Sequence, residues 1–136
     1  MSAEFTVDVS VRYRDLDPLN HVNHAVYASY LEVARTAYLE EVVDVAAEDI
    51  SFVLANLEIS YERPITMGDD PTVAVSVSRL GDSSCTMAYE IRVDGDIAAT
   101  AETTMVHIDP ETRRPSSIPD PMAQRIRNRE ELEAAA

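Results

Sequence analysis

Two periodicities of apolar residues divide the chain into one predicted helix and five predicted strands. Apolar and polar positions alternate over residues 5–13, and the same period of two returns at about residues 51–63, 72–80, 85–93 and 97–108. Residues 24–43 instead repeat apolar side chains every three or four positions, which is typical of a helix packed on one face. Asn23 is placed to cap the start of that helix. The order is strand, long helix, four strands.

The turns between the predicted strands favour an antiparallel sheet. The pair Asp94-Gly95 lies between two alternating segments, which is a strong signal for a hairpin. In the segment 51–63, the alternation predicts one face made of Val53, Ala55, Leu57, Ile59 and Tyr61. After Asp109 the alternation stops, and Asp120 with Pro121 predicts the N-cap and first residue of a short helix. The pattern therefore predicts one α+β domain over residues 1–136, with a core at about 5–109 and a tail at 110–136.

Composition narrows the class of protein further. The 136 residues are 46% hydrophobic and 26% charged, which suits one folded domain. The 25 acidic residues face 11 basic residues, all of them arginine, for a net charge of −14. Such a surface repels nucleic-acid phosphates and anionic lipids, so we expect neither partner. It fits a halophilic protein, whose self-repulsion salt would screen; the alternative is a soluble acidic protein from a GC-rich genome.

The sequence also predicts the cellular location. No apolar segment is long enough to span a membrane, and the first residues do not form a signal peptide. The lone cysteine, Cys85, cannot form an internal disulfide, and its place among apolar neighbours predicts a buried, unreactive side chain. We therefore expect a cytoplasmic protein.

Residues 11–35, VRYRDLDPLNHVNHAVYASYLEVAR, resemble the signature of the 4-hydroxybenzoyl-CoA thioesterase-like branch of the hotdog-fold superfamily. The later segments YERPITMGDD, SRLGDSSCTMAYEIRVDG and IAATAETTMVHID also resemble that family, so that the likeness covers about residues 5–120. It implies a five-stranded antiparallel sheet wrapped around one long helix, assembled as a homodimer and often as a homotetramer. It also implies hydrolysis of an acyl-CoA thioester to a free acid and CoA, without a metal or organic cofactor.

The resemblance assigns the catalytic carboxylate to Asp17, acting as nucleophile or as general base. It assigns the backbone N–H of His24, near the start of the helix, to the thioester oxygen, where negative charge develops. The alternative for Asp15 and Asp17 is that they only cap the turn before the helix. Further candidates for binding the substrate are Asn23, Tyr27, Arg63, Ser83 and Ser84.

Several of these residues also have simpler interpretations. Tyr27 fits a helix–sheet core as well as an acyl pocket, and each arginine could pair with a surplus carboxylate instead of a CoA phosphate. Asn20 stands where the family usually has glycine, and it is suited to a positive φ. Asp17, His21 and His24 could hold a metal only if the loop folded around the ion. As functions, a non-catalytic acyl-CoA-binding module, a hydratase and an acyl carrier protein thioesterase remain alternatives.

Overall fold

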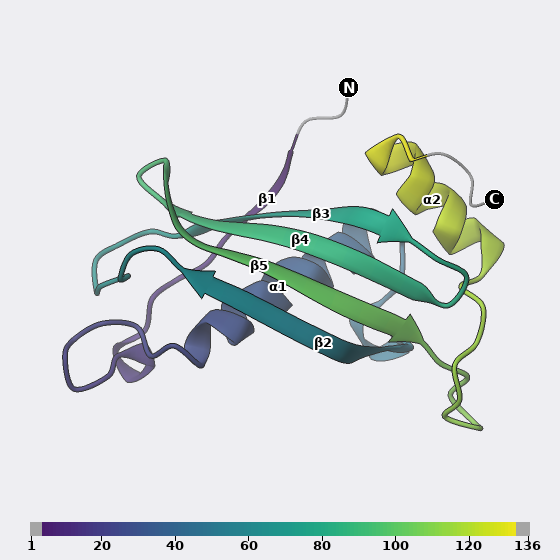
Figure 1. Cartoon of the computed structure of the whole chain (residues 1–136), viewed down its shortest axis with the longest axis horizontal. Helices are drawn as coiled ribbons and strands as arrows, with labels where there is room; N and C mark the ends of the chain where they lie inside the picture. The colour runs from purple at the N-terminus through teal and green to yellow at the C-terminus, as the bar shows by residue number, and fades with distance from the viewer. Residues whose placement is uncertain (1–3, 133–136) are drawn as a thin grey trace.

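Five strands form one antiparallel sheet in the computed structural model of the chain, which describes residues 4–132 (Figure 1). The order across the sheet is β1-β3-β4-β5-β2. The elements are β1 (Phe5–Asp8), α1 (Val26–Glu41), β2 (Phe52–Tyr61), β3 (Thr72–Leu80), β4 (Ser84–Val93), β5 (Asp96–His107) and α2 (Asp120–Glu130). The α+β fold with a sheet wrapped around one long helix is therefore confirmed. The predicted tail continues past this region, and residues 133–136 lie outside the described part.

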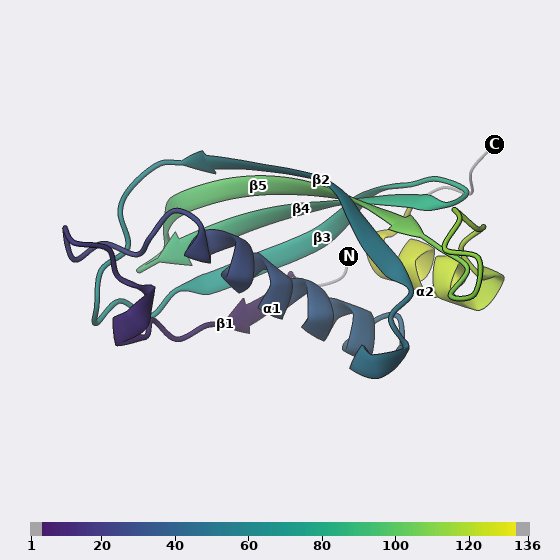
Figure 2. The ribbon, with the colours of Figure 1, turned by 90° about the horizontal axis from the view of Figure 1, so that it is seen from below.

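The core lies between α1 and the concave face of the sheet, as Figure 2 shows. Leu31, Ala34 and Tyr38 of α1 are fully buried, as the period of the sequence predicts. The facing side chains of β3 and β4 alternate as expected, and all are buried: Val73, Val75, Val77, Cys85, Met87, Tyr89, Ile91 and Val93. The two periodicities thus meet in one apolar layer.

The first strand is shorter than its alternation predicts. β1 ends at Asp8, whereas the sequence predicts a strand through Tyr13. The reason lies in the partner strand, because Val9 is opposite Pro71, which precedes β3. The Val9 N–H donates to the Pro71 carbonyl (3.0 Å), but proline has no N–H to return the bond. Residues 13–15 then form a 3₁₀ turn.

The long helix starts later than predicted, at Val26, and Asn23 is not its N-cap. The Asn23 Oδ1 atom accepts from the Ala25 N–H (2.9 Å), and the Asn23 carbonyl accepts from the Val26 N–H (2.9 Å). These bonds close a turn of the asparagine type just before the helix. His24 therefore lies in the turn, ahead of the first helical residue.

A β-bulge in β2 changes which of its side chains share a face. The register with β5 shifts between Leu54 and Asn56, so Ala55 is the extra residue. Leu54, opposite the buried Met105, joins the face of Leu57, while Val53 turns to the other face of the sheet. The single alternating face of Val53, Ala55, Leu57, Ile59 and Tyr61 is therefore wrong in its first half.

The hairpin prediction for β4 and β5 is confirmed. Asp94 and Gly95 both have positive φ, 53° and 83°, and Val93 pairs with Asp96 across the turn. A two-residue turn in which both residues have positive φ has a twist that matches the right-handed twist of the flanking strands.

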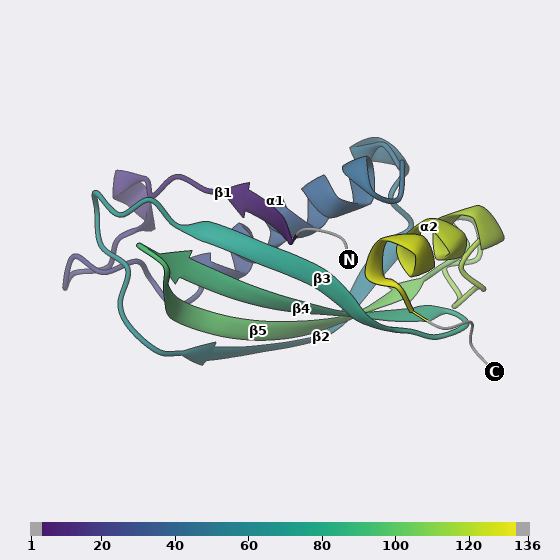
Figure 3. The same cartoon turned by 90° about the horizontal axis from the view of Figure 1, so that it is seen from above.

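Helix α2 packs against the sheet instead of extending from it. It begins at Asp120, one residue earlier than predicted, because the Pro119 carbonyl already accepts from the Ala123 N–H (3.0 Å). Figure 3 shows α2 beside β3, at the end of the sheet opposite the loop that precedes α1. Ala123 and Ile126 are buried in the same core as α1. No helix in the described range 4–132 combines the length and apolar character needed to cross a membrane.

Candidate active site

The residues before α1 form a small hairpin of their own, which we call the site loop (residues 16–24). Leu16 and Val22 form an isolated antiparallel bridge, and the Asp17 N–H donates to the His21 carbonyl (2.7 Å). At the tip, the Asn20 N–H donates to the Asp17 carbonyl (2.9 Å). Asn20 has a φ of 63°, which confirms that asparagine takes the left-handed position expected there.

The site loop is fixed to the connection between β2 and β3. The Val22 N–H donates to the Ile65 carbonyl (2.8 Å), and His21 forms an isolated bridge with Thr66. Asp69 in turn accepts from the N–H (2.9 Å) and hydroxyl (3.2 Å) of Thr66. Segments far apart in the sequence thereby hold the loop at one end of the sheet.

Asp15 anchors the start of this loop from inside the protein. Its side chain is 2% exposed, and its Oδ2 atom accepts from the Arg12 N–H and the Tyr30 hydroxyl, both at 2.9 Å. Burial is the largest influence on its pKa and opposes ionisation, but the hydrogen bonds from Arg12 and Tyr30 outweigh burial and hold the pKa below its usual value. The structural interpretation of Asp15 is confirmed.

Asp17 is placed differently, half-buried and at the surface of the loop. Its Oδ1 atom accepts from the backbone N–H groups of Leu19 (2.9 Å) and His21 (3.2 Å), so this carboxylate does cap the turn. Its Oδ2 atom accepts no hydrogen bond from any residue in the range 4–132. Capping therefore uses one oxygen and leaves the other available for chemistry.

The backbone of His24 lies next to the N-terminus of α1. Its side chain is exposed, and its carbonyl accepts from the Tyr61 hydroxyl (2.8 Å). The His24 N–H donates to no group within the described part of the chain. An unpaired N–H at a helix start can stabilise negative charge on an oxygen.

Tyr27 is 3% exposed and belongs to the core more than to a cavity. Its ring makes an edge-to-face contact with Tyr61 at 4.8 Å and a tilted contact with Tyr30 at 6.4 Å. Burial raises the pKa of its hydroxyl. Tyr27 therefore forms the wall behind the His24 turn.

The other predicted binding residues lie farther from Asp17. Arg63 is at the same end of the sheet, where it pairs with Asp96 of the β4–β5 hairpin (3.3 Å). Ser83 and Ser84 are at the opposite end of the sheet, since Ser84 pairs with Val106, near the end of β5. Within one chain, the site loop and the start of α1 thus carry Asp17, Asn23, His24 and Tyr27, and the two serines lie at the other end of the sheet.

The sequence also raises the question of two other kinds of site, a metal site in the loop and a reactive cysteine. Asp17, His21 and His24 do not gather as a metal-binding group, and residues 4–132 hold no cluster of three or more such side chains close enough for an ion. Cys85 is 4% exposed. Burial, and to a smaller extent the charge of Glu130, raises the pKa of its thiol to about 12. This thiol is a buried apolar side chain, as predicted.

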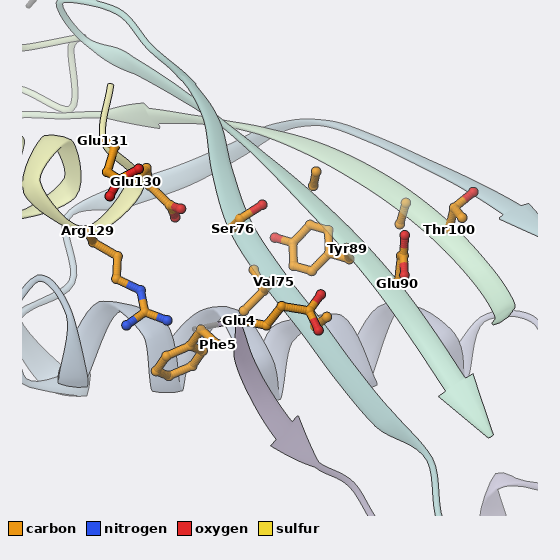
Figure 4. Close-up of a pocket in the computed structure, with 13 residues that line it drawn as sticks. Glu4, Phe5, Val75, Ser76, Tyr89, Glu90, Thr100, Arg129, Glu130 and Glu131 are labelled. Atoms are coloured by element: carbon orange, nitrogen blue, oxygen red, sulfur yellow. The ribbon is translucent and has the colours of Figure 1, made fainter. Parts of the chain in front are cut away.

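A groove of about 490 Å³ lies elsewhere, between the start of β1, the middle of the sheet and the end of α2 (Figure 4). Glu4, Glu90, Arg129 and Glu130 surround it, and none of the site-loop residues lines it. The carboxylates of Glu4 and Glu90 are occupied by Arg92, at 2.7 Å each. The groove is thus separate from the candidate chemistry.

Comparison with known proteins identifies the superfamily of the chain. A family model described as the thioesterase-like superfamily matches residues 11–126, which include the site loop, α1 and all of the sheet except β1. The chain belongs to this superfamily. The resemblance to hotdog-fold thioesterases is therefore confirmed, and the unpaired Asp17 oxygen lies within the matched region.

Relatives of this thioesterase-like chain have named activities. The long-chain acyl-CoA thioesterase FadM of Escherichia coli K12 is 30% identical over 123 residues, 87% of this chain and 93% of FadM. The acyl-CoA thioester hydrolase YbgC of Escherichia coli O6:H1 is 26% identical over 85% of this chain and 90% of YbgC.

Solved structures share the same architecture. A thioesterase of Thermus thermophilus, crystallised with coenzyme A and Zn, superposes with a TM-score of 0.87 at 39% identity, covering 95% of this chain and 96% of that protein. SAV2348 of Staphylococcus aureus, solved in complex with CoA, shares the fold with a TM-score of 0.90 at 17% identity, covering 100% of this chain and 89% of that protein.

Sequence reasoning missed one residue of the site, Tyr61. It follows the alternation of β2, so the pattern marks it only as a strand residue. Its hydroxyl reaches a carbonyl 37 positions away in the chain. A local pattern of apolar residues cannot predict this contact, because the contact depends on how the edge strand β2 packs beside the start of α1.

Proposed function

We propose that this thioesterase-like protein hydrolyses acyl-CoA thioesters to the free acid and CoA, with Asp17 as nucleophile or general base. The observation that carries the proposal is the free Oδ2 atom of Asp17 in a loop that also presents the unpaired His24 N–H. The named activities of FadM and YbgC, and the CoA bound to the Thermus thermophilus thioesterase, support the substrate class.

The residues supply both parts of the reaction. As a general base, the Asp17 carboxylate removes a proton from the attacking water, a C–O bond to that water forms while the C–S bond breaks, and the proton passes to the departing thiolate of CoA. As a nucleophile, Asp17 attacks the thioester carbon and forms a mixed anhydride as the CoA thiolate leaves. Water then cleaves this anhydride to the free acid and the Asp17 carboxylate, and the proton released from the water passes to the thiolate. The His24 N–H donates to the carbonyl oxygen as it becomes negative, a contribution of roughly 2.7–4 kcal/mol for one such donor. Because a carboxylate and an N–H suffice, we propose that no metal or organic cofactor takes part.

The test compares the native protein with Asp17→Asn for thiol release from short, long and aromatic acyl-CoAs. Asparagine keeps an oxygen that can accept from Leu19 and His21, so the loop should persist while the charge is lost. We expect kcat/KM to fall at least a hundredfold for the best substrate, within the range of a general base. Asp70→Asn, at an exposed position, is the matched control and should keep native activity.

Two results would contradict this proposal. Full activity in Asp17→Asn would exclude Asp17 as the catalytic carboxylate. Binding of acyl-CoA by the native protein, without turnover of any substrate in the panel, would favour the non-catalytic binding module.

We further propose that the active form is a homodimer, and that two such dimers can join as a homotetramer. The edge strand β2 exposes apolar side chains on its core face, with Leu54 at 46%, Leu57 at 37% and Tyr61 at 48% exposure. An apolar edge strand favours pairing with a second copy. A second chain would also close the site loop from solvent and bring a second set of Ser83 and Ser84 toward the interface.

The net charge and the single cysteine support two proposals, about the source organism and about the cellular compartment. A net charge of −14 without lysine suits a salt-rich cytoplasm, where screening reduces self-repulsion. The buried, lone Cys85 suits a reducing compartment. We therefore propose a cytoplasmic enzyme of a halophilic source.

A further inference from the structure

Tyr61 connects the edge strand to the turn that carries the proposed oxyanion donor. It is the last residue of β2, and its hydroxyl donates to the His24 carbonyl at 2.8 Å. Its ring packs edge-to-face on Tyr27, the first buried residue of α1, with 4.8 Å between centroids. The ring contact limits where the hydroxyl can lie, so the hydrogen bond has a defined direction.

The turn around His24 is fixed on both sides of this bond. The Asn23 N–H donates to the Asp15 carbonyl (2.8 Å), and the N–H groups of Ala25 and Val26 donate to the side chain and carbonyl of Asn23 (2.9 Å each). The carbonyl of His24 is fixed by Tyr61. Of the backbone groups at residues 23–25 that face this turn, the His24 N–H is left as a donor without an acceptor inside the described chain.

From these contacts we propose that Tyr61 is a positioning residue, which orients the His24 N–H toward the thioester oxygen. This inference rests on the function proposed above. Catalysis by a donor depends on its direction before the reaction, because reorientation during the reaction costs part of the stabilisation. The His24 N–H belongs to the peptide between Asn23 and His24, whose carbonyl accepts from the Val26 N–H. The Tyr61 hydroxyl holds the next peptide, between His24 and Ala25, and so limits rotation about the His24 backbone. Without this hydroxyl the turn is held by fewer hydrogen bonds, and the His24 N–H loses part of its fixed direction. The substrate still binds through CoA, so the loss affects the transition state more than the ground state.

The first test is the variant Tyr61→Phe, which removes the hydroxyl and keeps the ring. Using the acyl-CoA that the native enzyme hydrolyses fastest, we expect kcat to fall about tenfold while KM changes less than about twofold. Tyr13→Phe is the control, since Tyr13 is 83% exposed, and it should match the native enzyme. A raised KM with native kcat would overturn the proposal, because it would assign Tyr61 to substrate binding.

The second test does not depend on activity. Amide hydrogen exchange of the substrate-free protein should be faster in Tyr61→Phe at Ala25 and Val26, whose bonds to Asn23 close the turn, with native rates in β3 and β4. Unchanged exchange at these two amides would overturn the positioning role. Faster exchange in a protein that hydrolyses no acyl-CoA would instead refute the proposed function and leave the contact between Tyr61 and the turn established.

Discussion

At the scale of single residues, Asp15 and Asp17 show how position separates two similar side chains. Asp15 is 2% exposed and uses both oxygens for hydrogen bonds, whereas Asp17 is half-buried and uses one. A carboxylate whose oxygens are all occupied inside the protein stabilises the loop but cannot reach a substrate. The one with a free oxygen at the surface can act on a thioester. The sequence Asp15-Leu16-Asp17 alone does not distinguish them.

Asp15→Asn tests the anchoring role. The amide oxygen can take the place of Oδ2 and keep the bonds from the Arg12 N–H and the Tyr30 hydroxyl. The amide NH₂ then faces the Arg12 guanidinium in place of Oδ1, and the negative charge is lost, so near neutral pH the free energy of unfolding should fall by about 1–3 kcal/mol. Because the pKa of Asp15 is lowered in the folded state, its contribution is present above the unfolded pKa and is lost as pH falls through the folded pKa.

Urea unfolding of the native protein and the Asn variant, at neutral and at acidic pH, measures this effect. The difference between the two proteins should shrink as the pH is lowered, since the native carboxyl is then neutral as well. A difference that stays constant with pH would show that the charge of Asp15 does not contribute.

At the scale of elements, α2 lies along the outer edge of β3. Among residues 4–132 the pairing of β3 with β1 ends at Val75, and the Val77 N–H donates to the Glu130 carboxylate (2.7 Å). The same oxygen accepts from the Tyr38 hydroxyl (2.6 Å), so one side chain ties α2 to the sheet and to α1. Arg129 also lies over the Phe5 ring at 5.7 Å. Through Glu130, α2 therefore holds this edge of β3 against α1.

Glu130→Ala should separate α2 from the domain. The Val77 N–H and the Tyr38 hydroxyl would lose their acceptor, and we expect the free energy of unfolding to fall by about 1–3 kcal/mol. Glu41→Ala, at an exposed position at the end of α1, is the control and should change it by about 0.5 kcal/mol or less. Native stability in Glu130→Ala, measured by urea unfolding, would contradict this role.

At the scale of the whole molecule, charge and the open edge decide how the protein behaves in solution. Six ion pairs among the described residues each have at least one side chain that is well exposed to water. Because water screens such pairs, they offset little of the repulsion between the carboxylates. The surplus of carboxylates is therefore mainly self-repelling. Repulsion within one chain lowers stability, repulsion between chains opposes assembly, and salt reduces both effects.

We expect the midpoint of thermal unfolding to rise steadily as KCl is raised from about 0.1 M to 1 M, as the Debye length falls from roughly 10 Å to 3 Å. KCl is preferred to sulfate, because sulfate strengthens apolar burial in any protein. A midpoint that is constant or falls with KCl would contradict a fold limited by its own charge, and with it the halophilic proposal.

The dimer is tested by Leu57→Arg, which places a charge on the exposed core face of β2. Analytical ultracentrifugation should give a dimer for the native protein and a monomer for this variant, because a buried, unpaired charge opposes pairing. Ile97→Arg is the matched control, with a similar exposure of 39% but on β5, and it should remain dimeric. A dimeric Leu57→Arg would place the interface elsewhere.

The sequence by itself determined the element types, the β4–β5 hairpin and the buried faces of β3, β4 and α1. Each depends on neighbours a few positions apart, and periodicity records these directly. The family signature in residues 11–35 also indicated Asp17 and His24, on which the proposed function rests.

Only the tertiary structure decided the end of β1, the bulge at Ala55, the burial of Asp15 and the contact of Tyr61 with His24. Each arises where segments distant in sequence meet: Pro71 opposite Val9, β5 beside β2, and Tyr30 over Asp15. A hydrogen bond between such segments is set by how the elements pack against one another, and a local pattern of apolar residues does not contain that information.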